Sequence, residues 1–167
     1  MTDRVKNMLA ILKKRDYRKL RSFGVRNVTE ETRGLNPYDR RAKLLELAFA
    51  ADVPSLYGGD DIFGFNRTTT AVPRDDEVTD WGFGNVILNF EKLLSTGLDG
   101  IKAEAEAELT DATGEERDFL CGVIKSLAAC DGIIERYRVR AEIDGRKGLA
   151  AALGQVPKRG ARSYYEA

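Results

Sequence analysis

The most informative absence in this sequence of 167 residues is histidine, which does not occur at all. Histidine is the commonest general base and the commonest transition-metal ligand in proteins. Its absence excludes Ser-His and Cys-His hydrolase mechanisms, and any zinc site that uses histidine, for this chain acting alone. The sequence therefore offers no metal-binding candidate.

Cysteine is scarce, because the chain has only Cys121 and Cys130. On one helix, nine residues separate these two side chains by roughly 13.5 Å along the axis and by about half a turn. A disulfide needs the two Cα atoms within about 7 Å of each other. We therefore predict that the two cysteines are unpaired and act as small core residues rather than reactive groups.

Net charge and long apolar segments are also absent. The chain has 27 basic and 27 acidic residues, so no net charge directs it toward nucleic acid or an acidic membrane. Charged residues run through the N-terminus, which therefore resembles neither a signal peptide nor a membrane-spanning helix. Hydrophobic residues make up 43% of the chain, as expected for a folded protein. We expect a cytoplasmic location and no nucleic-acid or membrane partner.

No alternating pattern typical of strands persists over six residues, whereas apolar residues recur at helical spacing. The pattern predicts a mainly α-helical chain with helices near residues 3–20, 38–50, 90–109 and 115–142, and a short helix in the tail. The third of these helices should carry one apolar stripe, formed by Phe90, Leu94, Leu98, Ile101, Ala105 and Leu109. The stripe of the fourth should be formed by Leu120, Val123, Ile124, Leu127, Ile134, Tyr137 and Ala141. Asn36 and Pro37 form a helix-start signal, and Pro54 prevents the second helix from continuing. Within 90–109, Gly97 and Gly100 each cost about 1 kcal/mol relative to alanine, which indicates close packing against the backbone.

Residues 55–88 are the least helical part and separate two helical regions. A connection this long without regular structure is often functional or packed on a partner. Ser163 and Glu166 have the spacing of a capping box and predict the first turn of a helix. We divide the chain, as a single partial domain 1–167, into the segments 1–54, 55–88, 89–142 and 143–167. The insert 55–88 carries four large aromatic residues, Phe63, Phe65, Trp81 and Phe83.

Four segments resemble the pyruvate formate-lyase-like glycyl radical enzymes, in the same order. DDIFGFNRT is similar to that family's D-E-L-[IV]-G-N-R-T, and QVPKRGARSYYEA to its R-V-P-x-x-P-A-R-[ST]-F-x-E-A-L-Q. The third match is between the family's G-H-[VI]-x-P-[DN]-[YF]-E-K-[VL]-L-x-x-G-L-x-G-I-x-x-E and the segment GNVILNFEKLLSTGLDGIKAE. The fourth is between the family's next helix and the segment RDFLCGVIKSLAACDGIIERYRVRAE. The chain departs from the pattern at Asn85, where many members have histidine or arginine, and at Leu88 and Gly160, where they have proline.

The resemblance implies the N-terminal helical part of an enzyme built on a ten-stranded α/β barrel, with the barrel strands absent from this chain. Family members hold a radical on a glycine near the C-terminus and pass it to a cysteine loop inside the barrel. A radical S-adenosylmethionine activase installs that radical. Neither the cysteine loop nor the R-V-[SA]-G-[YF] glycine segment occurs here. We therefore expect no catalytic residue and no bound cofactor in this chain, the barrel portion as its partner, and a possible homo-oligomer.

The resemblance also assigns site residues. It places Asn85 where the family brings a polar side chain to the substrate, and the neutral carboxamide argues against pyruvate, whose carboxylate an arginine would pair. An equal alternative is that Asn85 caps the third helix or bonds the loop backbone. Residues of the shared motifs are expected to be structural: Gly64, Asn66, Arg67, Gly84, Gly97 and Gly100.

Two functional hypotheses follow from these observations. In the first, the chain is a fragment or subunit of a glycyl radical lyase or dehydratase of the formate acetyltransferase type, active only in anaerobic metabolism and inactive alone. In the second, it is a helical interaction protein that kept this scaffold without the chemistry. If the scaffold lacks its barrel, Tyr164, Tyr165 and the insert aromatics should be exposed or self-associated, since apolar patches normally find a partner.

Overall fold

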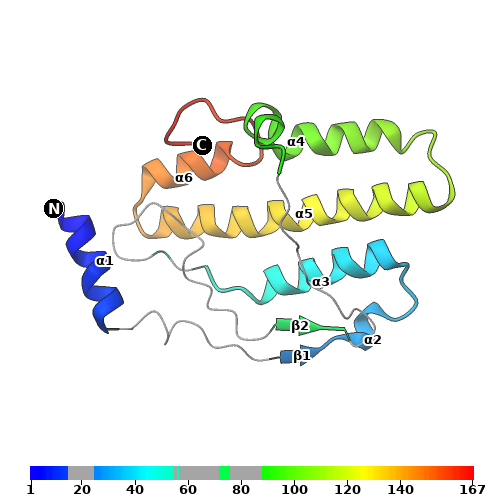
Figure 1. The fold of residues 1–167 in the computed structure, drawn as a ribbon, viewed down its shortest axis with the longest axis horizontal. Helices are drawn as coiled ribbons and strands as arrows, with labels where there is room; N and C mark the ends of the chain where they lie inside the picture. The colour runs from blue at the N-terminus through cyan, green and yellow to red at the C-terminus, as the bar shows by residue number, and fades with distance from the viewer. Residues whose placement is uncertain (15–24, 55, 57–71, 76–87) are drawn as a thin grey trace.

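The computed structural model describes residues 1–14, 25–54, 56, 72–75 and 88–167. Most of these residues are helical, which confirms the prediction of a mainly α-helical chain (Figure 1). The elements in chain order are α1 (Asp3–Lys14), β1 (Val25–Asn27), α2 (Thr29–Thr32), α3 (Pro37–Ala51), β2 (Val72–Arg74), α4 (Phe90–Glu108), α5 (Gly114–Ile143) and α6 (Lys147–Gln155).

The boundaries of α3 and α5 lie within one or two residues of the prediction. The Asn36 side chain accepts a hydrogen bond from the backbone N–H of Asp39 at 2.8 Å, and Pro37 occupies the first turn. Both features are those of a favourable helix start, so the helix-start signal is confirmed. The helix predicted over 3–20 is confirmed as far as Lys14, and its remainder lies outside the described residues.

Helix α4 differs from the prediction of one continuous helix with one apolar stripe. Gly97 has φ 67° and ψ −174°, so α4 consists of two helical halves joined at a kink. Ala105 is buried in the second half, but Phe90 and Leu94 in the first half are 57% and 40% exposed. The predicted stripe that joins these residues is therefore wrong, because the kink turns the first half away from the core.

A small sheet was not predicted from the sequence. Strands β1 and β2 pair in parallel with Val25 opposite Val72, in segments that the sequence predicts to be loop and irregular insert. Three residues are too few to show alternation, so the pattern gave no signal. This pair is the whole of the sheet structure in the described part of the chain, which holds no barrel.

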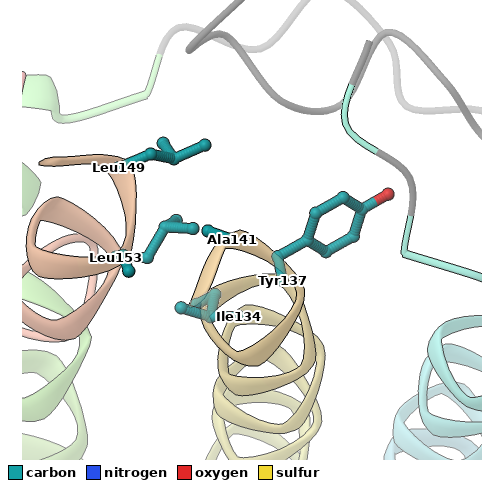
Figure 2. Close-up of a cluster of buried hydrophobic side chains, with 6 residues drawn as sticks. Ile134, Tyr137, Ala141, Leu149 and Leu153 are labelled. Carbon is teal, nitrogen blue, oxygen red and sulfur yellow. The ribbon is translucent and has the colours of Figure 1, made fainter. Parts of the chain in front are cut away.

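Helix α5 lies at the centre of the fold, between α3 on one side and α4 and α6 on the other (Figure 1). Its residues Ile134, Tyr137 and Ala141 belong to the main apolar cluster with Leu149 and Leu153 of α6. Ile134 and Ala141 lie toward α6, whereas the Tyr137 ring points away from α6, toward Asp52 at the end of α3 (Figure 2). The predicted α5 stripe is confirmed for these three residues. No helix among the described residues has the length and apolar character needed to cross a membrane.

Candidate functional site

The kink of α4 is held by backbone hydrogen bonds to the segment that follows α6. The N–H groups of Leu98 and Asp99 donate to the carbonyls of Pro157 and Lys158, both at 2.8 Å. On the other side of the kink, the Ala161 N–H donates to the Leu94 carbonyl, also at 2.8 Å. The segment 157–161 thus binds both halves of α4, and we call this contact the α4–tail junction.

Two glycines make the α4–tail junction possible. A Cβ atom on Gly97 would lie 2.5 Å from Cα and carbonyl C of Arg159, and the positive φ of Gly97 is itself unfavourable for other residues. A Cβ on Gly160 would overlap the Ser95 carbonyl oxygen. The close approach that the sequence predicts at Gly97 is therefore present. At Gly100 the three atoms nearest to an added Cβ all belong to the Thr96 side chain of the same helix, so its tightest contact is local rather than with another segment.

Beyond the α4–tail junction, the tail forms a single turn. The Glu166 N–H donates to Ser163 Oγ at 3.3 Å, which is one half of the predicted capping box. The Glu166 carboxylate instead accepts from the Arg162 backbone N–H at 2.7 Å and from its guanidinium at 2.6 Å. These hydrogen bonds from Arg162 lower the pKa of Glu166. The reciprocal capping bond is therefore replaced by an Arg162–Glu166 pair.

A buried carboxylate fixes the end of α3 to α5. Tyr137 donates its hydroxyl hydrogen to Asp52 Oδ2 at 3.0 Å, and Asp52 is almost fully buried. Arg136 donates to the carbonyl of Phe49 at 2.6 Å and to that of Asp52. Among the described residues, the second carboxylate oxygen, Asp52 Oδ1, has no hydrogen-bond partner. The point where the chain leaves α3 toward the insert is thus held by two consecutive residues of α5.

A second buried carboxylate fixes the residue after β2. Asp75 accepts a hydrogen bond from the Thr32 hydroxyl, and the Arg40 guanidinium lies 3.4 Å from the same oxygen. Both Asp75 and Thr32 are fully buried, so this pair is shielded from water. Neither Asp52 nor Asp75 could be identified from the sequence, because their partners Tyr137 and Thr32 are distant along the chain.

The third fixed point is the start of α4. Asn89 Oδ1 accepts from the Lys92 backbone N–H at 3.0 Å, so Asn89 is the N-cap of α4. Capping of this helix by Asn85 is therefore wrong, whereas the other half of that alternative, a bond from Asn85 to the loop backbone, falls outside the described residues. Several residues predicted for the site lie outside the described residues: Gly64, Asn66, Arg67, Gly84 and Asn85, with the aromatics Phe63, Phe65, Trp81 and Phe83.

Both cysteines are free on α5, as the sequence predicts, but they are half-buried rather than fully buried core residues, and only Cys130 lies against the apolar cluster. Cys130 packs against the apolar cluster, and burial, together with the neighbouring Asp131 charge, raises the pKa of its thiol. A raised pKa reduces the thiolate fraction on which reactivity depends. Among the residues with defined positions, no group of three cysteine or acidic side chains could hold a metal ion.

Comparison with known proteins gives one match. The family model described as pyruvate formate lyase-like matches residues 68–167, which is more than half of the chain. The matched segment includes α4, α5, α6 and the α4–tail junction. No curated protein and no solved structure shows a significant match.

Proposed function

This chain belongs to the pyruvate formate lyase-like family, and we propose that it supplies the helical scaffold of a glycyl radical enzyme whose reacting groups lie outside these 167 residues. The observation that carries the proposal is the family match over residues 68–167, which agrees with the resemblance read from the motifs. The reaction class is that of a radical lyase or dehydratase of the formate acetyltransferase type.

The composition of the chain supports a role without chemistry of its own. No segment matches R-V-[SA]-G-[YF], since SFGVR and GFGNV both differ from it. Cys121 and Cys130 lie within a long helix, and the raised pKa of Cys130 disfavours its thiolate. The residues present therefore do not fit either radical-bearing group. The complete enzyme would need a glycine, a cysteine loop and a radical S-adenosylmethionine activase from elsewhere.

Three fixed points around the insert support the proposed scaffold role. Asp52 is tied to α5, Asp75 to α2 and α3, and Asn89 to the first turn of α4. In this proposal Asn85, four residues before Asn89, presents its carboxamide to the substrate. A carboxamide both donates and accepts hydrogen bonds but has no charge. A neutral, hydroxylated or carbonyl substrate suits it better than a carboxylate.

The test uses cells that produce a tagged form of this protein at its native level. The tagged protein is isolated from them in the absence of oxygen. We expect the isolated material to include a polypeptide, continuous with this chain or bound to it, that carries the cysteine loop and the radical glycine. After treatment with the activase, electron paramagnetic resonance should show a glycyl doublet in that material and none in the 167-residue chain alone. A doublet on this chain alone would contradict the proposal. Isolation without any such polypeptide would favour the interaction-protein hypothesis.

A further inference from the structure

Helix α1 lies outside the helical body of the protein. Among the described elements, α3, α4 and α6 each pack on α5, whereas α1 makes no comparable contact with any helix or strand. Figure 1 shows α1 at the edge of the molecule, beside that body rather than within it. Val5 and Leu9 of α1 are 42% and 39% exposed. The described part of the chain therefore leaves this helix open to a partner.

The sequence of α1 has an apolar side. Val5, Met8, Leu9 and Leu12 recur at spacings of three and four residues, and residues at these spacings share one face of a helix. We call these four positions the α1 apolar face. A helix with one apolar face is stable in water only if that face is buried against something. The α1 apolar face thus predicts a contact that the described residues do not supply.

Basic residues accompany the α1 apolar face. Lys6 and Lys13 are seven residues apart, so they lie on the same side of the helix, and both are exposed. The sequence of α1 also contains Arg4 and Lys14 and one acidic residue, Asp3. Asp3 pairs with Lys6 at 3.0 Å, but both side chains are exposed and such a pair is weak. The helix keeps an excess of positive charge.

The charge of the chain is unevenly distributed. Residues 1–21 hold eight of the 27 basic residues and two of the 27 acidic residues, which leaves 19 basic and 25 acidic residues in the rest of the chain. A basic segment joined to an acidic remainder is typical of proteins that contact nucleic acid or a membrane. The expectation of no membrane partner rests on the net charge of the whole chain, which conceals this asymmetry.

We propose that α1 binds the surface of a lipid bilayer with anionic headgroups. The helix lies in the plane of the surface, with the α1 apolar face toward the acyl chains and its lysines among the headgroups. Its 12 residues extend for about 18 Å, whereas the hydrocarbon core is about 30 Å thick. The helix therefore lies on the bilayer and does not cross it. This proposal concerns α1 alone and does not rest on the proposed function.

A lipid surface suits α1 better than an acidic protein or a nucleic acid. The centres of protein interfaces are rich in aromatic residues and poor in lysine. The sequence of α1 has no aromatic residue, and three of its four basic residues are lysine. A nucleic acid would attract the charges but would leave the apolar face in water. An anionic bilayer accommodates both sides of the helix.

The first experiment locates α1 with an environment-sensitive fluorophore on the full chain. The fluorophore is attached at Leu9→Cys after Cys121→Ala and Cys130→Ala, and the probe is a vesicle of equimolar phosphatidylserine and phosphatidylcholine. The emission should shift to the blue when vesicles are added, because position 9 enters the acyl region. The control position is Ala10, which is exposed and lies about 140° around the helix from Val5. Equal shifts at both positions, or none at position 9, would overturn the proposal.

The second experiment measures the charge contribution by co-sedimentation with the same vesicles. Each lysine near an anionic surface contributes about fivefold, so K6Q/K13Q should lower the partition coefficient roughly thirtyfold. Raising the salt concentration should weaken wild-type binding in the same direction. The matched control is K92Q/K102Q on α4, which changes the net charge equally and should leave binding unchanged. Equal losses in the two double variants would show that net charge, and not α1, governs binding.

The third experiment measures the apolar contribution. Leu9→Ser should weaken binding roughly tenfold, because it removes a side chain that enters the bilayer. Leu94→Ser is the matched control, since Leu94 on α4 is 40% exposed, nearly the same as Leu9, and should not affect binding. Equal effects at the two positions would contradict the proposal.

Other occupants of α1 give different results in the same assays. No binding to the anionic vesicles, or equal binding to vesicles of phosphatidylcholine alone, would overturn the proposal. A dimer that forms without vesicles and dissociates in Leu9→Ser would instead assign the α1 apolar face to a second copy of this chain. Tighter binding to a DNA duplex than to the vesicles would assign the charges to nucleic acid. Either result would replace the lipid surface as the partner.

Discussion

The α5–α6 core and the α4–tail junction are two contacts that are built in opposite ways. The core is made of side chains, with Ile134 and Ala141 of α5 lying toward Leu149 and Leu153 of α6 (Figure 2). The α4–tail junction is made of backbone, and it depends on the absence of side chains at Gly97 and Gly160. The two contacts should therefore respond to opposite kinds of mutation: the core to loss of atoms, and the junction to their addition.

The largest effect is expected from Gly97→Ala. The added methyl group would lie 2.5 Å from the Arg159 backbone, and alanine would be strained at φ 67°. Strain and overpacking each cost about 1–3 kcal/mol, so we expect a loss of roughly 4 kcal/mol in the free energy of unfolding, measured with urea. The control is Gly132→Ala on α5, where nothing lies within 4 Å of the new Cβ. That change should stabilise the protein by about 0.5–1 kcal/mol. A tolerated alanine at position 97 would show that the kink is not fixed by the junction.

The next effect is expected from Leu153→Ala in the core. Leu153 is 4% exposed, and truncating a buried leucine costs about 2–5 kcal/mol, so we expect about 3 kcal/mol in the same unfolding measurement. Leu94→Ala is the matched control, because Leu94 is 40% exposed and should change stability by less than about 1 kcal/mol. Equal losses at the two positions would mean that the first half of α4 is packed against the core.

A smaller effect is expected from Tyr137→Phe, which removes the hydroxyl that donates to the buried Asp52 carboxylate. Leaving a buried acceptor unsatisfied costs about 1–3 kcal/mol, so we expect a loss of about 2 kcal/mol in the free energy of unfolding, measured with urea. Tyr38→Phe removes a hydroxyl that donates to Glu115 at the surface and should cost clearly less. If both variants were equally stable, the Asp52 contact would not hold the end of α3.

The smallest effect concerns reactivity rather than stability. Burial raises the pKa of the Cys130 thiol, so the folded protein keeps this thiol protonated at pH values where a free thiol ionises. The contribution of Cys130 to the free energy of unfolding is therefore fully present below the ordinary thiol pKa of about 8.5. It decreases as the pH rises through the raised pKa of the thiol in the folded protein. Alkylation of a Cys121→Ala variant at pH 8 should be slower in the folded than in the unfolded protein. Equal rates would show that Cys130 is accessible.

The side-chain core was predictable from sequence and most of the backbone contacts were not. Helical spacing predicted Ile134, Tyr137 and Ala141, because burial of one face repeats along the helix. The kink was not predicted, since Gly97 indicates a close approach but not which segment approaches. The Asp75–Thr32 contact joins residues 43 positions apart and leaves no local pattern. The resemblance to the family was confirmed by the family model, whereas the role of Asn85 stays a prediction.

Amide hydrogen exchange of the wild-type chain tests the α4–tail junction most directly. The N–H groups of Leu98, Asp99 and Ala161 donate across the junction, and they should exchange slowly and with similar opening free energies. In Gly97→Ala, all three should lose protection together while Ile134 and Ala141 in α5 keep theirs. Rapid exchange of these three amides in the wild-type chain would contradict the account, because the first half of α4 would then not be fixed to the tail.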